Sequence, residues 1–182
     1  MSTIVLITGG CRSGKSAYAR KLAEAMRPRR AYLATCPAID QEMHRRIEEH
    51  RRRRAVAEWE TIEEPLYLAG AIGSAGTFNV LLVDCLTLWV NNLMFEAERH
   101  GGAVTEQDVA DRCGEVLASC ATHPGTVFFV TNEVGAGIVP ENAIARAYRD
   151  LAGRCNQVIA AGADEVILIS CGIPLTLKGT RT

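Results

Sequence analysis

The sequence predicts a single α/β domain over residues 1–182, with a mostly parallel sheet flanked by helices. Two observations lead to this fold class. Short apolar runs alternate along the chain with segments whose apolar residues recur every three or four positions, which is the pattern of successive βα units. The 182 residues are 48% hydrophobic, contain no internal repeat and suffice for one core of ordinary size.

The apolar runs predict six strands. They cover residues 4–8, 31–34, 59–63, 78–84, 127–131 and 165–170. A helix is expected after Gly14, because Ala19, Ala23 and Met26 share one helical face and Pro28 ends the pattern. A second helical pattern begins at Asp40. A weak one lies in the Ala/Gly-rich stretch at 68–76. Three more helices are expected at 86–99, 105–120 and 141–161.

Composition excludes several classes of protein. The 20 Lys+Arg and 21 Asp+Glu leave a formal net charge of -1, which argues against a nucleic-acid partner and against a polybasic membrane anchor. Charged residues make up 23%, and with the high apolar content this excludes intrinsic disorder.

The cysteines and the N-terminal segment predict the compartment. The seven cysteines form no C-x-x-C pair and no Cys/His metal spacing, so we expect free thiols in a reducing environment. The apolar run at 4–7 is too short for a signal peptide or a membrane span. We therefore expect a soluble, cytoplasmic protein.

A phosphate-binding loop is predicted at residues 9–16, which fit G-x-x-x-x-G-K-[ST] between a predicted strand and a predicted helix. The backbone N–H groups would surround phosphate oxygens, Lys15 would reach the β- and γ-phosphates, and the Ser16 hydroxyl would bind Mg²⁺. A glycine-rich turn with a surface lysine is the plainer alternative, and the strand and helix context disfavours it. The expected nucleotide-binding residues are Gly9, Gly10, Cys11, Arg12, Ser13, Gly14, Lys15 and Ser16, with Lys15 also catalytic.

Asp84 ends the buried apolar run Val80–Val83, which is the form of a Walker B strand. A carboxylate there would share the Mg²⁺ with Ser16. Asp84 could instead cap the helix at 86–99, but the phosphate loop in the same chain favours the metal role.

Residues 44–54 contain six arginines and two histidines. This segment is strongly basic, although the charge of the whole chain is nearly balanced. A solvated helix face, with Glu48 and Glu49 as partners, is the plain interpretation. In a nucleotide enzyme, arginines bind triphosphates, and His50, in line with Met43 and Ile47, could attack phosphorus. Two other histidines, His100 and His123, are expected at the surface.

Motifs along the whole chain converge on one family. They are Thr8–Ser16, Ala34-Thr35, Glu42-Met43, Arg46-Ile47, His50-Arg51, Trp59–Thr61 with Glu63, Asp84–Thr87, Val130–Gly135, Gly137–Asn142 and Arg149–Arg154 through Asn156-Gln157. With these motifs the chain resembles, nearly end to end, the bifunctional adenosylcobinamide kinase / adenosylcobinamide-phosphate guanylyltransferase family of cobalamin biosynthesis.

The resemblance implies two reactions. ATP or GTP phosphorylates the corrinoid adenosylcobinamide, and GTP then gives GMP to that phosphate with loss of pyrophosphate. It also implies a GMP-linked histidine at His50, a RecA-like P-loop fold and a homotrimer. The implied nucleotide contacts outside the loop are Thr35, Cys36, Pro37, Arg51, Arg52, Arg53, Arg54, Glu63 and Asp84.

Five further residues have expected roles outside the nucleotide contacts. Glu133, after the strand at 127–131, is a candidate base or orienter for the kinase reaction, and a carboxylate that caps backbone N–H groups is an equal alternative. Trp59 and Trp89 are expected to pack in the core or at a subunit interface. Cys113 and Cys120, seven residues apart, are expected on a buried helix face.

Three other functions are compatible with parts of this pattern. A monofunctional small-molecule kinase would never retain the α-phosphate of GTP on the protein. A GTPase switch lacks support, because Asn132 is followed by Glu133 and no N-K-x-D motif occurs. A RecA-like module that binds nucleic acid through the arginine helix is the weakest option, given the near-zero net charge.

Overall fold

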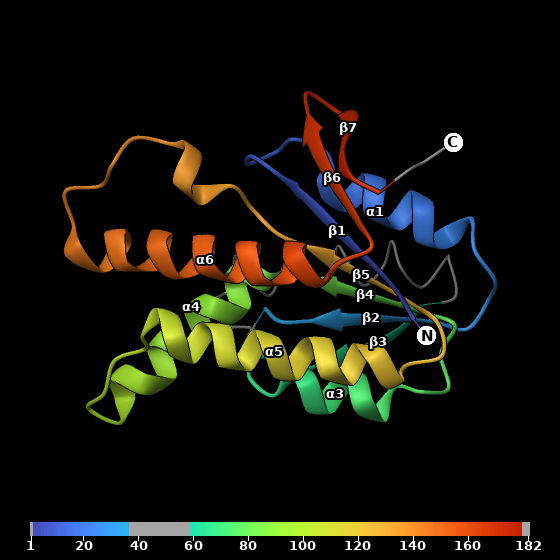
Figure 1. The fold of residues 1–182 in the computed structure, drawn as a ribbon, viewed down its shortest axis with the longest axis horizontal. Coiled ribbons are helices and arrows are strands. Elements are labelled where there is room, and N and C mark those ends of the chain that lie inside the picture. The colour runs from blue at the N-terminus through green and yellow to red at the C-terminus, as the bar shows by residue number, and fades with distance from the viewer. Residues whose placement is uncertain (1, 37–58, 180–182) are drawn as a thin grey trace.

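The sheet runs through the centre of the molecule (Figure 1), and the computed structural model describes residues 2–36 and 59–179. In this part of the chain the strand order is β3-β2-β4-β5-β1-β6-β7. Strands β1 to β6 are parallel to their neighbours, and β7 is antiparallel to β6, which confirms a mostly parallel α/β sheet. The strands are β1 Thr3–Gly9, β2 Arg30–Ala34, β3 Trp59–Glu63, β4 Val80–Asp84, β5 Thr126–Val130, β6 Glu165–Ser170 and β7 Ile173–Lys178.

The five α-helices of the described residues lie where the sequence predicts them. They are α1 Lys15–Glu24, α3 Leu68–Ser74, α4 Leu86–Arg99, α5 Glu106–Thr122 and α6 Ala143–Gly162. A short 3₁₀ helix that was not predicted, η1 Val134–Ala136, precedes α6. Two of the α-helices have clear start signals. Thr105 and Asp108 form a capping box at α5, and the Asn142 side chain accepts the first free N–H groups of α6. Helix α1 ends before Met26, which is 40% exposed instead of lying on the predicted helical face.

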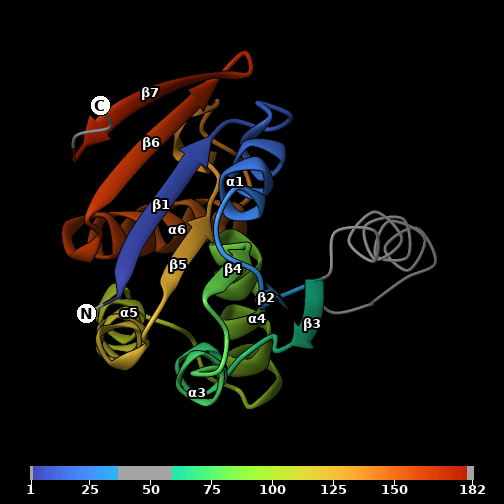
Figure 2. The same ribbon diagram turned by 90° about the vertical axis from the view of Figure 1, so that its right-hand side faces the viewer.

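Helices cover both faces of the sheet, which is why the central strands are apolar on both sides. Helix α1 packs on one face through Ala19 and Ala23, and α3, α4, α5 and α6 cover the other (Figure 2). Trp59 and Trp89 are buried, one on each face, as expected of core residues. Burial of a side chain of this size stabilises the fold by about 2 to 3 kcal/mol.

The carboxyl ends of five strands meet at one edge of the sheet. The registers align Ile7 of β1 with Val130 of β5, Val130 with Asp84 of β4, Asp84 with Ala34 of β2, and Ala34 with Glu63 of β3. Because β5 lies between β1 and β4, the residues after β5 stand between the phosphate loop and Asp84. Ligands of open parallel sheets bind at this kind of edge.

Strand β7 was not predicted from the sequence. Cys171 and Gly172 have φ of 53° and 79°, and Ser170 pairs with Ile173, so these two residues form a tight hairpin turn. The apolar residues of β7 are exposed, so this strand carries no burial pattern that would mark it as part of the core.

The expectation that His123 lies at the surface was wrong. His123 is buried, its Nδ1 accepts the backbone N–H of Gly125, and its Nε2 lies 3.2 Å from the carbonyl of Ala75. It therefore connects the end of α3 to the loop between α5 and β5. His100 is exposed, as predicted.

Candidate active site

The loop at 9–16 connects β1 to α1 and has the shape that its motif predicts. Gly14 adopts a φ of 96° immediately before α1, and the Ser13 N–H donates to the Gly10 carbonyl over 3.2 Å. The first N–H groups of a helix have no partner within the helix, and they carry its partial positive charge. The end of β1 and the start of α1 therefore bring together backbone N–H donors suited to a phosphate anion.

Gly9 is required by close packing. A Cβ at this position would lie 2.4 Å from the Ile169 carbonyl oxygen and 2.7 Å from the Ser13 hydroxyl. The hairpin turn between β6 and β7 supports the loop from outside, because the Gly172 N–H donates to the Ser13 carbonyl over 2.9 Å. Any larger residue at Gly9 would displace β6 or open the loop.

Lys15 is held by two neutral oxygens. Its ammonium donates to the Gly10 carbonyl over 3.0 Å and to the Asn132 side-chain oxygen over 2.8 Å. Neither acceptor carries a formal charge, so these two bonds hold the ammonium beside the loop without neutralising it. A phosphate group in the loop would meet this charge.

Asp84 does not cap α4. The N-cap residue of α4 is Cys85, no side chain caps the helix, and Asp84 instead accepts a hydrogen bond from the Tyr32 hydroxyl over 2.9 Å. Burial, with a further contribution from the Asp84 charge, raises the pKa of the Cys85 thiol. Cys85 is therefore a neutral neighbour of Asp84 and not a thiolate nucleophile.

Ser16 and Asp84 form a donor set that suits magnesium. A hydroxyl and a carboxylate are hard oxygen ligands, and Mg²⁺ binds proteins through few side chains together with substrate phosphates and water. Within residues 2–36 and 59–179, no group of three or more His, Cys, Asp or Glu side chains is placed to hold a metal. The residues present fit an ion shared with a nucleotide rather than one enclosed by protein.

Glu133 lies beside the phosphate loop. Its carboxylate accepts a hydrogen bond from the Thr8 hydroxyl, and its backbone N–H donates to the Gly9 carbonyl over 3.2 Å. Helix η1, which follows it, has no side-chain cap from Glu133. Glu133 reaches the same edge as Lys15 and Asp84 and is available for chemistry there.

The remaining predicted residues are spread along the edge. Cys11 and Arg12 are exposed in the loop, and Cys36 is half-buried after β2. Glu63 is exposed at the end of β3, four strand spacings or about 19 Å from β1. The sequence expectations for Pro37, His50, Arg51, Arg52, Arg53 and Arg54 lie outside the described residues.

Thr35 has a structural role in this arrangement. It is fully buried, and its hydroxyl both accepts the Cys85 N–H and donates to the Cys85 carbonyl, each over 2.8 Å. Its side chain is thus committed to the turn between β4 and α4. The predicted nucleotide contact does not fit this side chain.

Three residues of this edge were missed as functional candidates. They are Asn132, which holds Lys15, Thr8, which holds Glu133, and Tyr32, which holds Asp84. Each contact joins different strand ends, so the strand order was needed to find it. The only signal in the sequence was that Thr8 and Asn132 belong to the motifs of the family resemblance.

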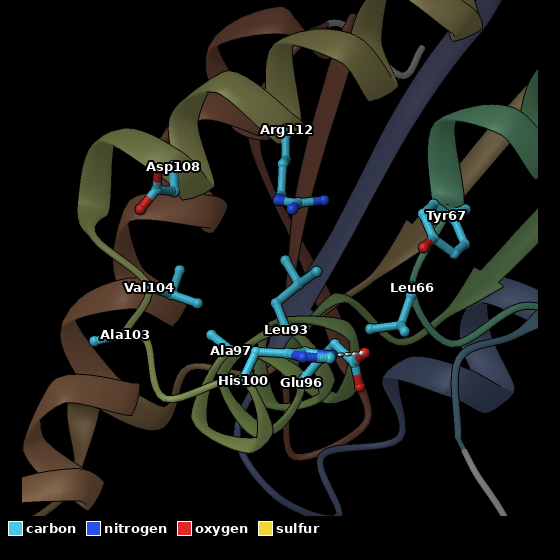
Figure 3. Close-up of a pocket in the computed structure, with 10 residues that line it drawn as sticks. All are labelled: Leu66, Tyr67, Leu93, Glu96, Ala97, His100, Ala103, Val104, Asp108 and Arg112. Atoms are coloured by element: carbon cyan, nitrogen blue, oxygen red, sulfur yellow. Dashed lines mark hydrogen bonds and ion pairs between the residues drawn. The ribbon is translucent and has the colours of Figure 1, made fainter.

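A separate cavity of about 300 Å³ lies between α4 and α5 (Figure 3). Glu96 of α4 and His100, the residue that follows α4, form a pair at 3.1 Å on its wall, and Arg112 of α5 points into it. Its lining includes neither the phosphate loop nor Asp84. The cavity is therefore not part of the site at the sheet edge.

The fold and the sheet edge together define a P-loop nucleotide-binding protein. A KaiC-like protein from Pyrococcus horikoshii has a similar structure, with a TM-score of 0.53, 14% identity and coverage of 91% of this chain and 70% of that chain. At this identity the likeness concerns the fold alone, and it agrees with the RecA-like P-loop class. No helix in the described ranges has the length and apolar character needed to cross a membrane.

The sequence comparisons are more specific. Residues 5–177 match the family model described as cobinamide kinase / cobinamide phosphate guanyltransferase. Two relatives are named bifunctional adenosylcobalamin biosynthesis proteins: CobP of Pseudomonas aeruginosa, 44% identical over 96% of both chains, and CobU of Salmonella typhimurium, 41% identical over 96% of this chain and 99% of the relative. The chain belongs to the cobinamide kinase / cobinamide phosphate guanyltransferase family, as its motifs indicated.

Proposed function

We propose that this enzyme phosphorylates adenosylcobinamide with ATP or GTP, and then transfers GMP from GTP to adenosylcobinamide phosphate. The observation that carries the proposal is the convergence of Lys15, Ser16, Asp84 and Glu133 on one sheet edge in a chain of this family. Phosphoryl transfer needs such a set, because it depends on positioning and charge stabilisation more than on covalent chemistry by the protein.

In the kinase reaction, the alcohol oxygen of cobinamide attacks the γ-phosphorus and the nucleoside diphosphate leaves. Glu133 would accept the proton of that alcohol, and Lys15 would stabilise the charge on the transferred group. Ser16 and Asp84 would hold Mg²⁺, which supplies charge neutralisation when bound.

In the guanylyl transfer, an imidazole nitrogen of His50 would attack the α-phosphorus of GTP and displace pyrophosphate. A phosphate oxygen of adenosylcobinamide phosphate would then attack the same phosphorus and release the histidine. The phosphate loop can hold the pyrophosphate as the leaving group, and the covalent step divides one difficult transfer into two easier ones.

The histidine intermediate is tested by intact-mass analysis after incubation with Mg²⁺ and GTP. We expect the wild-type protein to gain the mass of one GMP group, to lose it on acid treatment, and to transfer it to adenosylcobinamide phosphate. The His50→Ala variant should gain nothing. The exposed residue His100 offers a matched control, because His100→Ala should keep the adduct.

An adduct that persists in His50→Ala would assign the nucleophile to another residue. Absence of any adduct from the wild type, together with intact kinase activity, would instead favour a monofunctional kinase.

We also propose that the enzyme is a cytoplasmic homotrimer. Ile173, Leu175 and Leu177 of the edge strand β7 are 68%, 56% and 57% exposed, so another copy could cover these apolar side chains. No disulfide joins the seven cysteines, all of which lie in the described ranges, and this suits a reducing compartment. Light scattering would then give a mass three times the 19.7 kDa of one chain.

A further inference from the structure

We propose that Asn132 is a positioning residue for Lys15, and that Asn156 of α6 fixes Asn132 in place. The role rests on the proposed function, since it concerns how the enzyme binds its nucleotide. Neither asparagine is predicted to touch the reacting atoms. Together they would set where the lysine charge stands when a triphosphate enters the loop.

In the hydrogen bond between Lys15 and Asn132, the donor and the acceptor are fixed by chemistry. The ammonium can only donate, so the atom 2.8 Å away must be the amide oxygen of Asn132. A second ammonium N–H goes to the Gly10 carbonyl at 3.0 Å. One of the three N–H groups of Lys15 is left by these two bonds to donate to a phosphate oxygen.

Asn156 fixes the main chain at Asn132 through both ends of its own amide. Its nitrogen donates to the Asn132 carbonyl over 3.2 Å, and its oxygen accepts the hydroxyl proton of Thr131 over 2.6 Å. Thr131 is fully buried and half-buried Asn156 lies on α6, so the end of β5 is tied to a long helix. Arg149 of the same helix adds a second bond, to the Gly135 carbonyl at 2.7 Å.

The neutral charge of Asn132 matters as much as its position. An aspartate of the same shape could accept the same bond from Lys15, but it would pair with the ammonium and repel the phosphates. Asparagine holds the lysine while leaving its full positive charge for the nucleotide. If Asn132 had only a structural role, Asn132→Asp would leave nucleotide binding unchanged, because the two side chains have the same shape and the position is partly exposed.

A double-mutant cycle tests the proposal by the direct binding of Mg²⁺-GTP, measured by titration calorimetry. Asn132→Ala should weaken binding about tenfold, in keeping with the loss of one hydrogen bond to a charged group, and Asn132→Asp should weaken it further. In a Lys15→Ala background, Asn132→Ala should change the affinity less than about twofold, because it acts through the lysine, whereas Asn132→Asp should keep the part of its effect that comes from repulsion of the phosphates. Asn156→Ala should weaken the binding of Mg²⁺-GTP less than Asn132→Ala does, and it too should have little effect in the Lys15→Ala background.

The matched control is Gln157→Ala, which removes an exposed amide from the next position of α6 and should leave the affinity unchanged. Thermal unfolding of every variant separates loss of binding from loss of fold. A full, additive loss of affinity for Asn132→Ala in the Lys15→Ala background would overturn the positioning role. If the wild type binds no Mg²⁺-GTP, the proposed function itself fails, and the two failures are thus distinct.

Discussion

At the scale of single residues, the site separates its charges. Lys15 is bonded to the neutral oxygens of Gly10 and Asn132, whereas Glu133 accepts a hydrogen bond from the Thr8 hydroxyl. The cation is thereby available to phosphate and the carboxylate to a proton. An arrangement in which these two side chains neutralised each other would weaken both functions.

The substitution Glu133→Gln tests the role of this carboxylate. Glutamine has nearly the same shape and can still accept the Thr8 hydroxyl, but it cannot accept a proton from the alcohol of cobinamide. We expect the kinase rate to fall about 100-fold or more, which is the usual contribution of a general base. Formation of the GMP adduct should continue, because that step needs no alcohol to be deprotonated.

Kinase activity and adduct formation are measured on the same preparation, by corrinoid phosphorylation and by intact mass. A kinase rate within about threefold of the wild type would show that Glu133 is not the base.

At the scale of helices and strands, the insertion of β5 between β1 and β4 brings the site together. The motif at 9–16 and the run that ends in Asp84 were both identified from the sequence, because each has a local signature of glycines or of apolar residues before an acid. The contacts of Asn132 and Tyr32 could not be predicted. They depend on which strands are neighbours, and that order is set by packing between distant segments.

The packing of α5 on the sheet predicts a loss of stability at alkaline pH. Cys113 and Cys120 lie on the buried face of this helix, as expected, and burial raises the pKa of Cys120 from 9.0 to about 12. The folded state therefore keeps a proton that the unfolded chain releases above pH 9. The free energy of unfolding contributed by this thiol is fully present below pH 9 and falls by about 1.4 kcal/mol per pH unit as the pH rises towards 12.

Urea denaturation between pH 8 and pH 10.5, in the presence of a reductant, measures this slope. We expect Cys120→Ala to make the free energy of unfolding fall less steeply with pH, by up to the contribution of one proton. A slope should remain in this variant, because the pKa of Cys155 is also raised. Equal slopes for the wild type and Cys120→Ala would contradict the account of α5 packing.

At the scale of the whole molecule, the sequence was most informative about the sheet and least informative about its outer parts. Six strands were predicted from their apolar runs, and five of them, β1, β2, β4, β5 and β6, are largely buried, whereas β7 is exposed along its whole length. His123 was placed at the surface because a histidine beside a loop gives no sign of burial, although it joins α3 to the loop before β5.

We propose that one phosphate-binding loop serves both reactions. The described chain has one such loop, at the edge where Asp84 and Glu133 also lie. Both reactions hold a triphosphate, and they differ in which phosphorus is attacked and by which group. Loss of the Lys15 charge should therefore impair both.

The most direct test follows the mass of the corrinoid product. Wild-type enzyme given adenosylcobinamide, Mg²⁺, ATP and GTP should add first a phosphate and then a GMP group. His50→Ala should stop at the phosphate. Lys15→Ala should fail at both steps, even when it is supplied with adenosylcobinamide phosphate to bypass the first. Efficient transfer of GMP to that phosphate by Lys15→Ala would contradict the claim and require a second triphosphate site.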